Sequence, residues 1–246
     1  MENLLKLILP FLSTPKNYAQ VLKRLASFAF YETYFITLVL RSVPQFDAFF
    51  TGIETWGPIG KLLSVVPHYT ALNISGAVIG FAVAVLTHMF QFHDRISDVF
   101  GIRRRFDRKS ILVPMAQRVG AAVTPAKEIK IAQRRDKLMH AVFYKYASSR
   151  ADKPLVDKHD IEHALSAWSW YWVFVEAVAY WAVGAGIAWW LGSNGLARTL
   201  AITSFVFLVI AGLQRTRLGS YARPQIDSIV ANPAAAADVK QQFDAL

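Results

Sequence analysis

The 246-residue chain contains no cysteine, which excludes disulfide bonds, thiolate metal sites and a cysteine nucleophile. Motifs that mark common enzymes are missing as well: there is no phosphate-binding glycine loop, no GxSxG motif and no HExxH motif. The apolar segments carry no paired carboxylates that would bind a metal. We therefore expect a protein that is not an enzyme and that has no catalytic residue, metal or other cofactor.

The N-terminus lacks the features of a cleavable signal peptide. MENLLKLILPFL has an acidic residue near its start and no small-residue cleavage site before Ser13. Its apolar stripe, from which Lys6 reaches outward, predicts an interfacial amphipathic segment over residues 1–23. No internal repeat indicates a transporter built from inverted halves.

What the chain does contain is a long apolar stretch with tryptophans at both ends. The tryptophans are Trp168, Trp170 and Trp172 at its start and Trp189 and Trp190 at its end. From Trp170 to Trp190, a helix covers about 30 Å, the thickness of a bilayer's hydrocarbon core. Because tryptophan prefers the headgroup level at both interfaces, this pattern predicts a membrane-spanning helix.

Four such segments predict an all-α polytopic membrane protein with four transmembrane helices. The predicted spans cover residues 24–42, about 70–91, 167–191 and about 197–213. The first span has a short apolar run and carries Glu32, so an interfacial or re-entrant aromatic helix remains an alternative there. The predicted order is the N-terminal segment 1–23, a transmembrane hairpin 24–92, a helical segment 93–166, a second hairpin 167–213 and a helical tail 214–246.

The distribution of charge predicts how the chain crosses the membrane. Residues 93–166 hold 16 Lys and Arg against 9 Asp and Glu, whereas the turn 192–196 holds no charge. The positive-inside rule then places residues 93–166 and both termini in the cytoplasm, with the spans in the inner membrane. This topology accounts for the net charge of +10, so we do not expect direct binding of nucleic acid.

Helix boundaries outside the spans can also be predicted. Pro114 marks a break, and Asp157 or Asp160 caps the helix that leads into the third span. The tail is expected to contain a separate short helix over residues 224–231 and another that Asn232 caps.

Glu176 is the most distinctive single residue, because it lies about two turns inside the third span. An ionised carboxylate at that depth is costly and needs a partner. One hypothesis is a pore, ion or proton site, and the other is a protonated glutamate that hydrogen-bonds across helices. The candidate partners are His88, near the end of the second span, or the same residue of a neighbouring subunit. Glu32 in the first span raises the same question.

Small residues occur at helical spacing in two spans and favour close helix packing. They are Gly76, Gly80 and Ala84 in the second span and Gly184 and Gly186 in the third. They predict either homo-oligomerisation or packing within one subunit.

A basic cluster follows the second span. It consists of Arg103, Arg104, Arg105, Arg108 and Lys109. The cluster predicts binding of anionic lipid headgroups or, alternatively, docking of an acidic ligand or a soluble cytoplasmic partner protein.

His159 and His163 share a helix face at a spacing that can bind a metal. A usable site needs further ligands, so we interpret the pair as part of a solvated face. With Glu162 and Glu176, His163 forms the one polar set that we can nominate for a lipid-modifying enzyme.

In span count, size and basic middle segment, the chain resembles the small four-span membrane effectors of prokaryotic antiviral defence systems. That resemblance implies a protein held silent until a signal or partner at its cytoplasmic segment releases membrane damage. We therefore expect an oligomeric pore-forming or membrane-perturbing effector. The alternatives are a membrane anchor or scaffold that recruits a soluble partner and, third, a membrane-embedded lipid-modifying enzyme.

Overall fold

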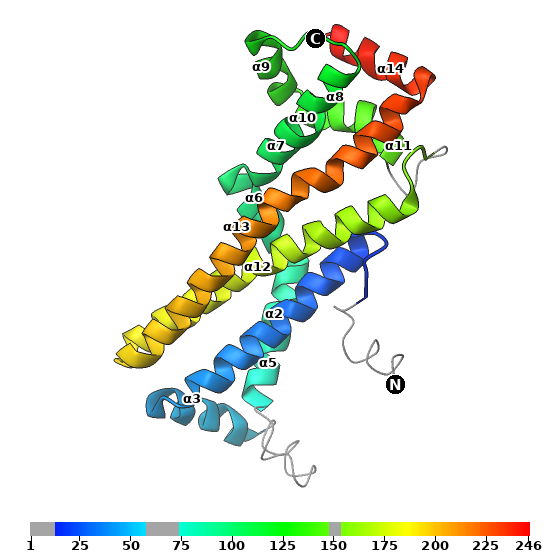
Figure 1. Ribbon diagram of the computed structural model, residues 1–246. Coiled ribbons are helices and arrows are strands. Elements are labelled where there is room, and N and C mark those ends of the chain that lie inside the picture. The colour runs from blue at the N-terminus through cyan, green and yellow to red at the C-terminus, as the bar shows by residue number, and fades with distance from the viewer. Residues whose placement is uncertain (1–12, 58–73, 148–153) are drawn as a thin grey trace. The chain divides into compact units, whose positions relative to one another are not determined.

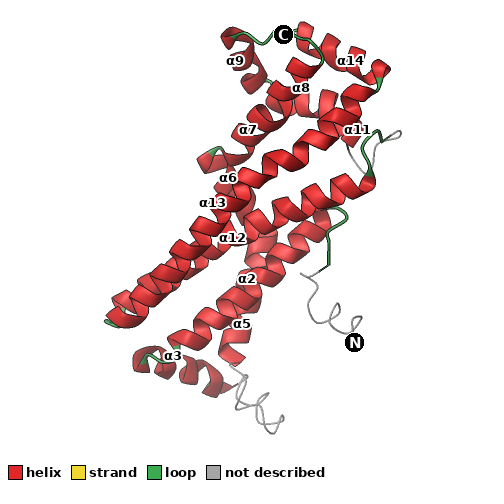
Figure 2. Ribbon diagram, in the orientation of Figure 1, coloured by secondary structure: helices red, strands yellow, loops and turns green. Residues whose placement is uncertain are grey.

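The computed structural model describes residues 13–57, 74–147 and 154–246, and all regular elements in this part of the chain are helices (Figures 1 and 2). In chain order they are α2 (Tyr18–Leu40), α3 (Pro44–Thr55), α5 (Ile74–Phe90), α6 (Phe92–Phe100), α7 (Ile102–Phe106), the π-helix η3 (Asp107–Leu112), α8 (Val113–Arg118), α9 (Pro125–Gln133), α10 (Arg135–Leu138), the π-helix η4 (Met139–Tyr144), α11 (Lys145–Ala147), α12 (Lys158–Trp190), α13 (Asn194–Ala231) and α14 (Pro233–Asp244). The predicted all-α class is confirmed for these residues. Half of the predicted interfacial segment, residues 1–12, lies outside them.

The chain divides into two compact units. Unit 1 contains the described parts of Leu22–His93 and Tyr171–Gly212. Unit 2 contains the described parts of Thr14–Val21, Asp94–Trp170 and Leu213–Leu246. The three longest helices, α2, α12 and α13, therefore contribute residues to both units.

Two helices, α12 and α13, are long and apolar enough to cross a membrane. A third candidate is α5 together with α6, which pass the same test as a pair but are bent by 56° at the break between them. Although α2 has 23 residues, every 18-residue stretch of it carries Lys23, Arg24 and Glu32, so it is too charged to qualify. The described residues thus contain two or three candidate spans, and the predicted four spans are not confirmed.

In unit 1, α12 and α13 form an antiparallel pair (Figure 1). The turn between them contains Gly192 with a φ of 77°, a left-handed conformation that favours glycine. Farther along the pair, the Ser204 hydroxyl donates a hydrogen bond of 2.9 Å to the Val178 carbonyl. Buried side chains of α2, α12 and α13 form an apolar core, which consists of Ile36, Leu40, Ala185, Ala188, Ala197 and Leu200. Unit 1 is therefore a bundle in which α2 packs on the α12–α13 pair.

Unit 2 has its own, larger apolar core. Fully buried members come from the C-terminal part of α13 (Ile226 and Ile229) and from α14 (Val239 and Phe243). Both π-helices face this core, with Leu112 from η3 among the buried side chains. The segment after α5 and the tail thus fold together into one helical unit.

Two predicted caps are confirmed. The Asp157 carboxylate accepts a hydrogen bond of 2.6 Å from the backbone N–H of His159 at the start of α12. The Asn232 side chain accepts hydrogen bonds from the backbone N–H groups of Ala234 and Ala235 at the start of α14, both of 3.1 Å. These side chains satisfy backbone donors that have no partner within the helix.

Two predicted breaks are wrong. No separate helix begins at residue 224, because α13 continues through Pro224 to Ala231 and buries Ile226 and Ile229 in the core of unit 2. The chain also stays helical through Pro114, because that residue directly follows the π-helix η3. In η3 the N–H of Val113 reaches back five residues to the Arg108 carbonyl, and this wider turn relieves the clash that a proline ring makes in an α-helix.

Candidate functional site

Glu176 lies in the interior of unit 1, where it is 1% exposed. Its Oε1 atom is 3.8 Å from Nδ1 of His93, which is also buried. This distance is longer than a hydrogen bond, and neither carboxylate oxygen has a well-formed hydrogen bond to a described residue. The structure therefore brings a buried acid and a buried imidazole together inside the helix bundle.

Aromatic and hydroxyl side chains surround this pair. The indole of Trp172 meets the His93 ring edge to face, with 5.8 Å between the ring centroids. One turn beyond Glu176, the Tyr180 hydroxyl is 2.9 Å from the Thr87 hydroxyl of α5, a distance that fits a hydrogen bond. The site is thus walled by large side chains of α12 on one side and by α5 and α6 on the other.

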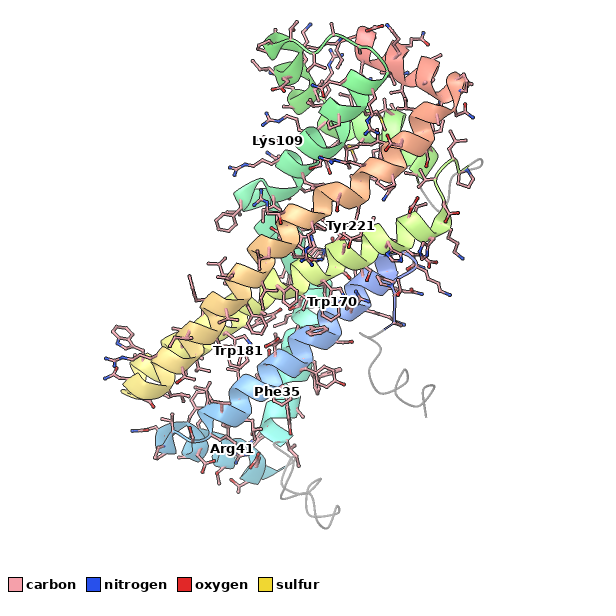
Figure 3. All side chains as sticks on the ribbon, viewed as in Figure 1. Phe35, Arg41, Lys109, Trp170, Trp181 and Tyr221 are labelled. Carbon is pink, nitrogen blue, oxygen red and sulfur yellow. The ribbon has the colours of Figure 1, made fainter. Side chains whose placement is uncertain are left out.

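Glu32 lies on α2 and accepts a hydrogen bond from the indole N–H of Trp181, which is labelled in Figure 3. Trp181 follows Tyr180 on α12, so the same helix contacts polar groups of both α2 and α5. The structure therefore places both predicted intramembrane glutamates in unit 1, each held by aromatic residues of α12.

The residue beside Glu176 is His93, whereas the predicted partner, His88, is exposed on α5. His88 and His93 are five positions apart, which turns their side chains by about 140° on a helix, so the two histidines face different sides. Between them, Gln91 has a φ of 47° and ends α5. The sequence gave no sign of that break, although the amphipathic residues after it did indicate a separate segment.

An acid and an imidazole in this arrangement can share a proton or exchange it. Removing water from both groups makes a lone charge costly, whereas a charged pair or a neutral pair is tolerated. A change in the separation of Glu176 and His93 would therefore change which of these states is stable. The arrangement suits a gate or a proton-linked site.

The predicted small residues lie at different kinds of places. A Cβ atom on Gly80 would lie 2.8 Å from the backbone oxygen of Phe30, so α5 and α2 are in backbone contact there. A Cβ atom on Gly184 would lie 2.8 Å from Cγ2 of Ile36. Gly186 has open space instead, Gly76 is buried and Ala84 is half-buried. Two of the five positions thus make close contacts within one chain.

The basic cluster lies in unit 2, on α7 and η3. Its members differ in surroundings: Arg104, Arg105 and Lys109 are exposed, Arg108 is half-buried, and Arg103 reaches Asp107 at 3.9 Å (Lys109 is labelled in Figure 3). Arg103 also approaches the Tyr144 hydroxyl at 3.4 Å. The exposed members present a positive surface.

Asp107 is a buried acid that the sequence did not single out. Arg135 donates a hydrogen bond of 3.0 Å to its carboxylate. Burial raises the pKa of Asp107 to about 6, and the guanidinium groups of Arg103 and Arg135 oppose that rise. Asp107 therefore ties the exposed cluster on α7 to α10 within unit 2.

The remaining predicted polar sets do not form sites among the described residues. His159 and His163 stack with 4.1 Å between ring centroids, and no group of three or more potential metal ligands is found in this part of the chain. Glu162 and Glu176, nominated together for an enzyme, lie on the same helix about 21 Å apart. The Glu162 carboxylate instead faces Lys158 at 3.8 Å.

Comparisons with known proteins give a family but no activity. No curated protein matches the chain, and no solved structure matches it. Nothing in these comparisons links the chain with the antiviral-defence effectors that its architecture resembles. One family model matches residues 17–245, nearly the whole chain including both units, and on this basis the chain belongs to the YmfE protein family.

Proposed function

We propose that the protein is a regulated pore-forming or membrane-perturbing effector that acts as a homo-oligomer in the inner membrane. The observation that supports this function best is the buried pair of Glu176 and His93 in unit 1. Ionisable groups within membrane-crossing helices are costly, and where they occur they commonly belong to ion or proton pathways. A purely structural bundle would have no need for a buried acid beside a buried imidazole.

The described arrangement corresponds to a closed state. Because Glu176 is 1% exposed, it reaches no water in this arrangement, and opening would have to hydrate it. His93 is joined directly to Asp94, with which unit 2 resumes. A signal or partner that moves α6 would therefore act on His93 through a single peptide bond and separate it from Glu176.

The proposed topology has four spans and both termini in the cytoplasm. Helices α12 and α13 and the bent pair α5–α6 supply three spans, and α2 supplies the fourth. The hydrogen bond from Trp181 to Glu32 shields the one acid of α2. With 23 residues, α2 is about 35 Å long, enough to cross the hydrocarbon core.

Flux from vesicles tests this function. The purified protein is placed in liposomes loaded with calcein and potassium, with and without an extract of host cells, and release is compared with that of Glu176→Ala and Glu176→Gln. We expect triggered release from the wild type and none from either variant, with equal amounts of inserted protein. Glu162→Gln is the matched control, because it removes a carboxylate of the same helix outside the apolar stretch. Normal release by Glu176→Ala would refute the proposal.

The second candidate is a membrane anchor that recruits a soluble partner. Unit 2 favours it, because this unit has its own core and presents the exposed Arg104, Arg105 and Lys109. A scaffold predicts tight liposomes under every condition and a silent Glu176→Ala variant. Charge reversal at Arg104 and Arg105 would then release the partner from membranes in a co-sedimentation assay.

A further inference from the structure

The end of α6 exposes two large apolar side chains. Val99 is 80% exposed and Phe100 is 63% exposed. On the opposite side of the same helix, His93 and Ser97 are buried. Because α6 is packed on one side, its apolar residues on the other side are held at the surface of unit 2.

The joint between α6 and α7 is fixed rather than loose. Gly101 has a φ of 59°, a left-handed conformation that reverses the direction of the chain. The Ser97 hydroxyl accepts a hydrogen bond of 3.2 Å from the backbone N–H of Arg103. This joint sets Arg103, Arg104 and Arg105 directly after the exposed Phe100, so an apolar edge is followed at once by three positive charges.

The distance of this edge from the candidate span matches the headgroup layer of a bilayer. α6 begins one residue after α5 and is bent from it by 56°. The nine residues of α6 rise about 12 Å, which at this angle moves Phe100 only about 7 Å beyond the end of α5 along the axis of that span. Each headgroup layer is about 5–7 Å thick, so Phe100 would remain within it.

We propose that α6 and α7 form an interfacial anchor whose partner is a bilayer that contains anionic phospholipid. Val99 and Phe100 enter the boundary between headgroups and acyl chains, and Arg104 and Arg105 bind the headgroup phosphates. Exposed apolar area beside positive charge is complementary to that layer and not to the hydrocarbon core alone. The anchor requires insertion of α5 in a membrane but holds with or without the proposed pore.

The absence of cysteine makes a clean test possible, because a single introduced cysteine is the only labelling position. Spin labels are attached to Val99→Cys, Phe100→Cys and, as the matched control, Ile129→Cys on α9, which is 60% exposed in the same unit. The full chain is reconstituted in vesicles of phosphatidylcholine with a quarter phosphatidylglycerol, and collision with oxygen and with a nickel chelate is measured. We expect labels at positions 99 and 100 to collide mainly with oxygen and the label at 129 mainly with nickel.

Three outcomes would overturn the anchor. Nickel collision at 99 and 100 equal to that at 129 would place the edge in water. Low collision with both reagents would mean that protein covers it. Equal immersion in vesicles of phosphatidylcholine alone would remove the role of the anionic lipid. With that lipid present, we expect Arg104→Gln and Arg105→Gln each to lower the ratio of immersed to exposed label about fivefold, and an unchanged ratio would also contradict the proposal.

Discussion

The close approach of α5 to α2 at Gly80 can be tested by adding one methyl group. In Gly80→Ala, the new Cβ would lie 2.8 Å from the backbone oxygen of Phe30 and 3.2 Å from its Cδ2 atom. A carbon and a carbonyl oxygen come no closer than about 3.3 Å in favourable contacts. Since the oxygen belongs to a helix backbone, it cannot rotate away, and the two helices must separate by about half an ångström.

The expected loss of stability follows from two opposing effects. Overpacking a close contact costs about 1–3 kcal/mol, and more when the neighbour is backbone. Replacing glycine by alanine inside a helix contributes about 0.5–1 kcal/mol in the other direction. We therefore expect Gly80→Ala to lower the free energy of unfolding by about 1–2 kcal/mol.

Unfolding of the purified protein in mixed micelles by increasing dodecyl sulfate measures this difference. Gly186→Ala is the matched control, because nothing lies within 4 Å of the added carbon, and we expect it to be neutral or slightly stabilising. Gly184→Ala should fall between the two, since its neighbour is the side chain of Ile36, which can move. If Gly80→Ala were as stable as Gly186→Ala, the contact between α5 and α2 would be refuted. A changed oligomeric state at unchanged stability would assign Gly80 to a contact between subunits instead.

Two further predictions concern unit 2. The pKa of Asp107 is about 6 in the folded chain against an ordinary 3.8, so the folded state keeps a proton that the unfolded state has lost. The free energy of unfolding should therefore fall as the pH rises from about 4 to about 6, by up to about 3 kcal/mol, and this slope should be smaller in Asp107→Asn but unchanged in Asp98→Asn; equal slopes in all three proteins would contradict the assignment. Asn232→Ala removes the cap that holds the N–H groups of Ala234 and Ala235, and hydrogen exchange in α14 should reveal a loss of about 1 kcal/mol, whereas unchanged protection would show that the cap is dispensable.

Features with a strong local cause were predictable from the sequence. The tryptophans at both ends of one apolar run and the GSNG turn after it indicated the α12–α13 pair. Asn232 before a proline indicated a helix start, and burial of Glu176 followed from the cost of an exposed charge in an apolar helix. Each of these inferences depended on a few neighbouring residues.

Features that depend on distant contacts were not predictable. Pro224 favours a break, but the burial of Ile226 and Ile229 in unit 2 outweighs the lost hydrogen bond and keeps α13 continuous. The partner of Glu176 depends on the bend at Gln91, a residue type that has no special preference for a positive φ. His93 was thus visible in the sequence, but its place in the site was not.

The π-helix η3 has a consequence for the register of unit 2. Its turns hold more residues than those of an α-helix, so η3 acts like an inserted residue between α7 and α8. Deleting one residue of η3 would restore α-helical winding and rotate everything after it by about 100°. Met115 and Ala116, both fully buried, would then turn out of the core. The sequence between α7 and α8 should therefore tolerate substitutions far better than a change in length.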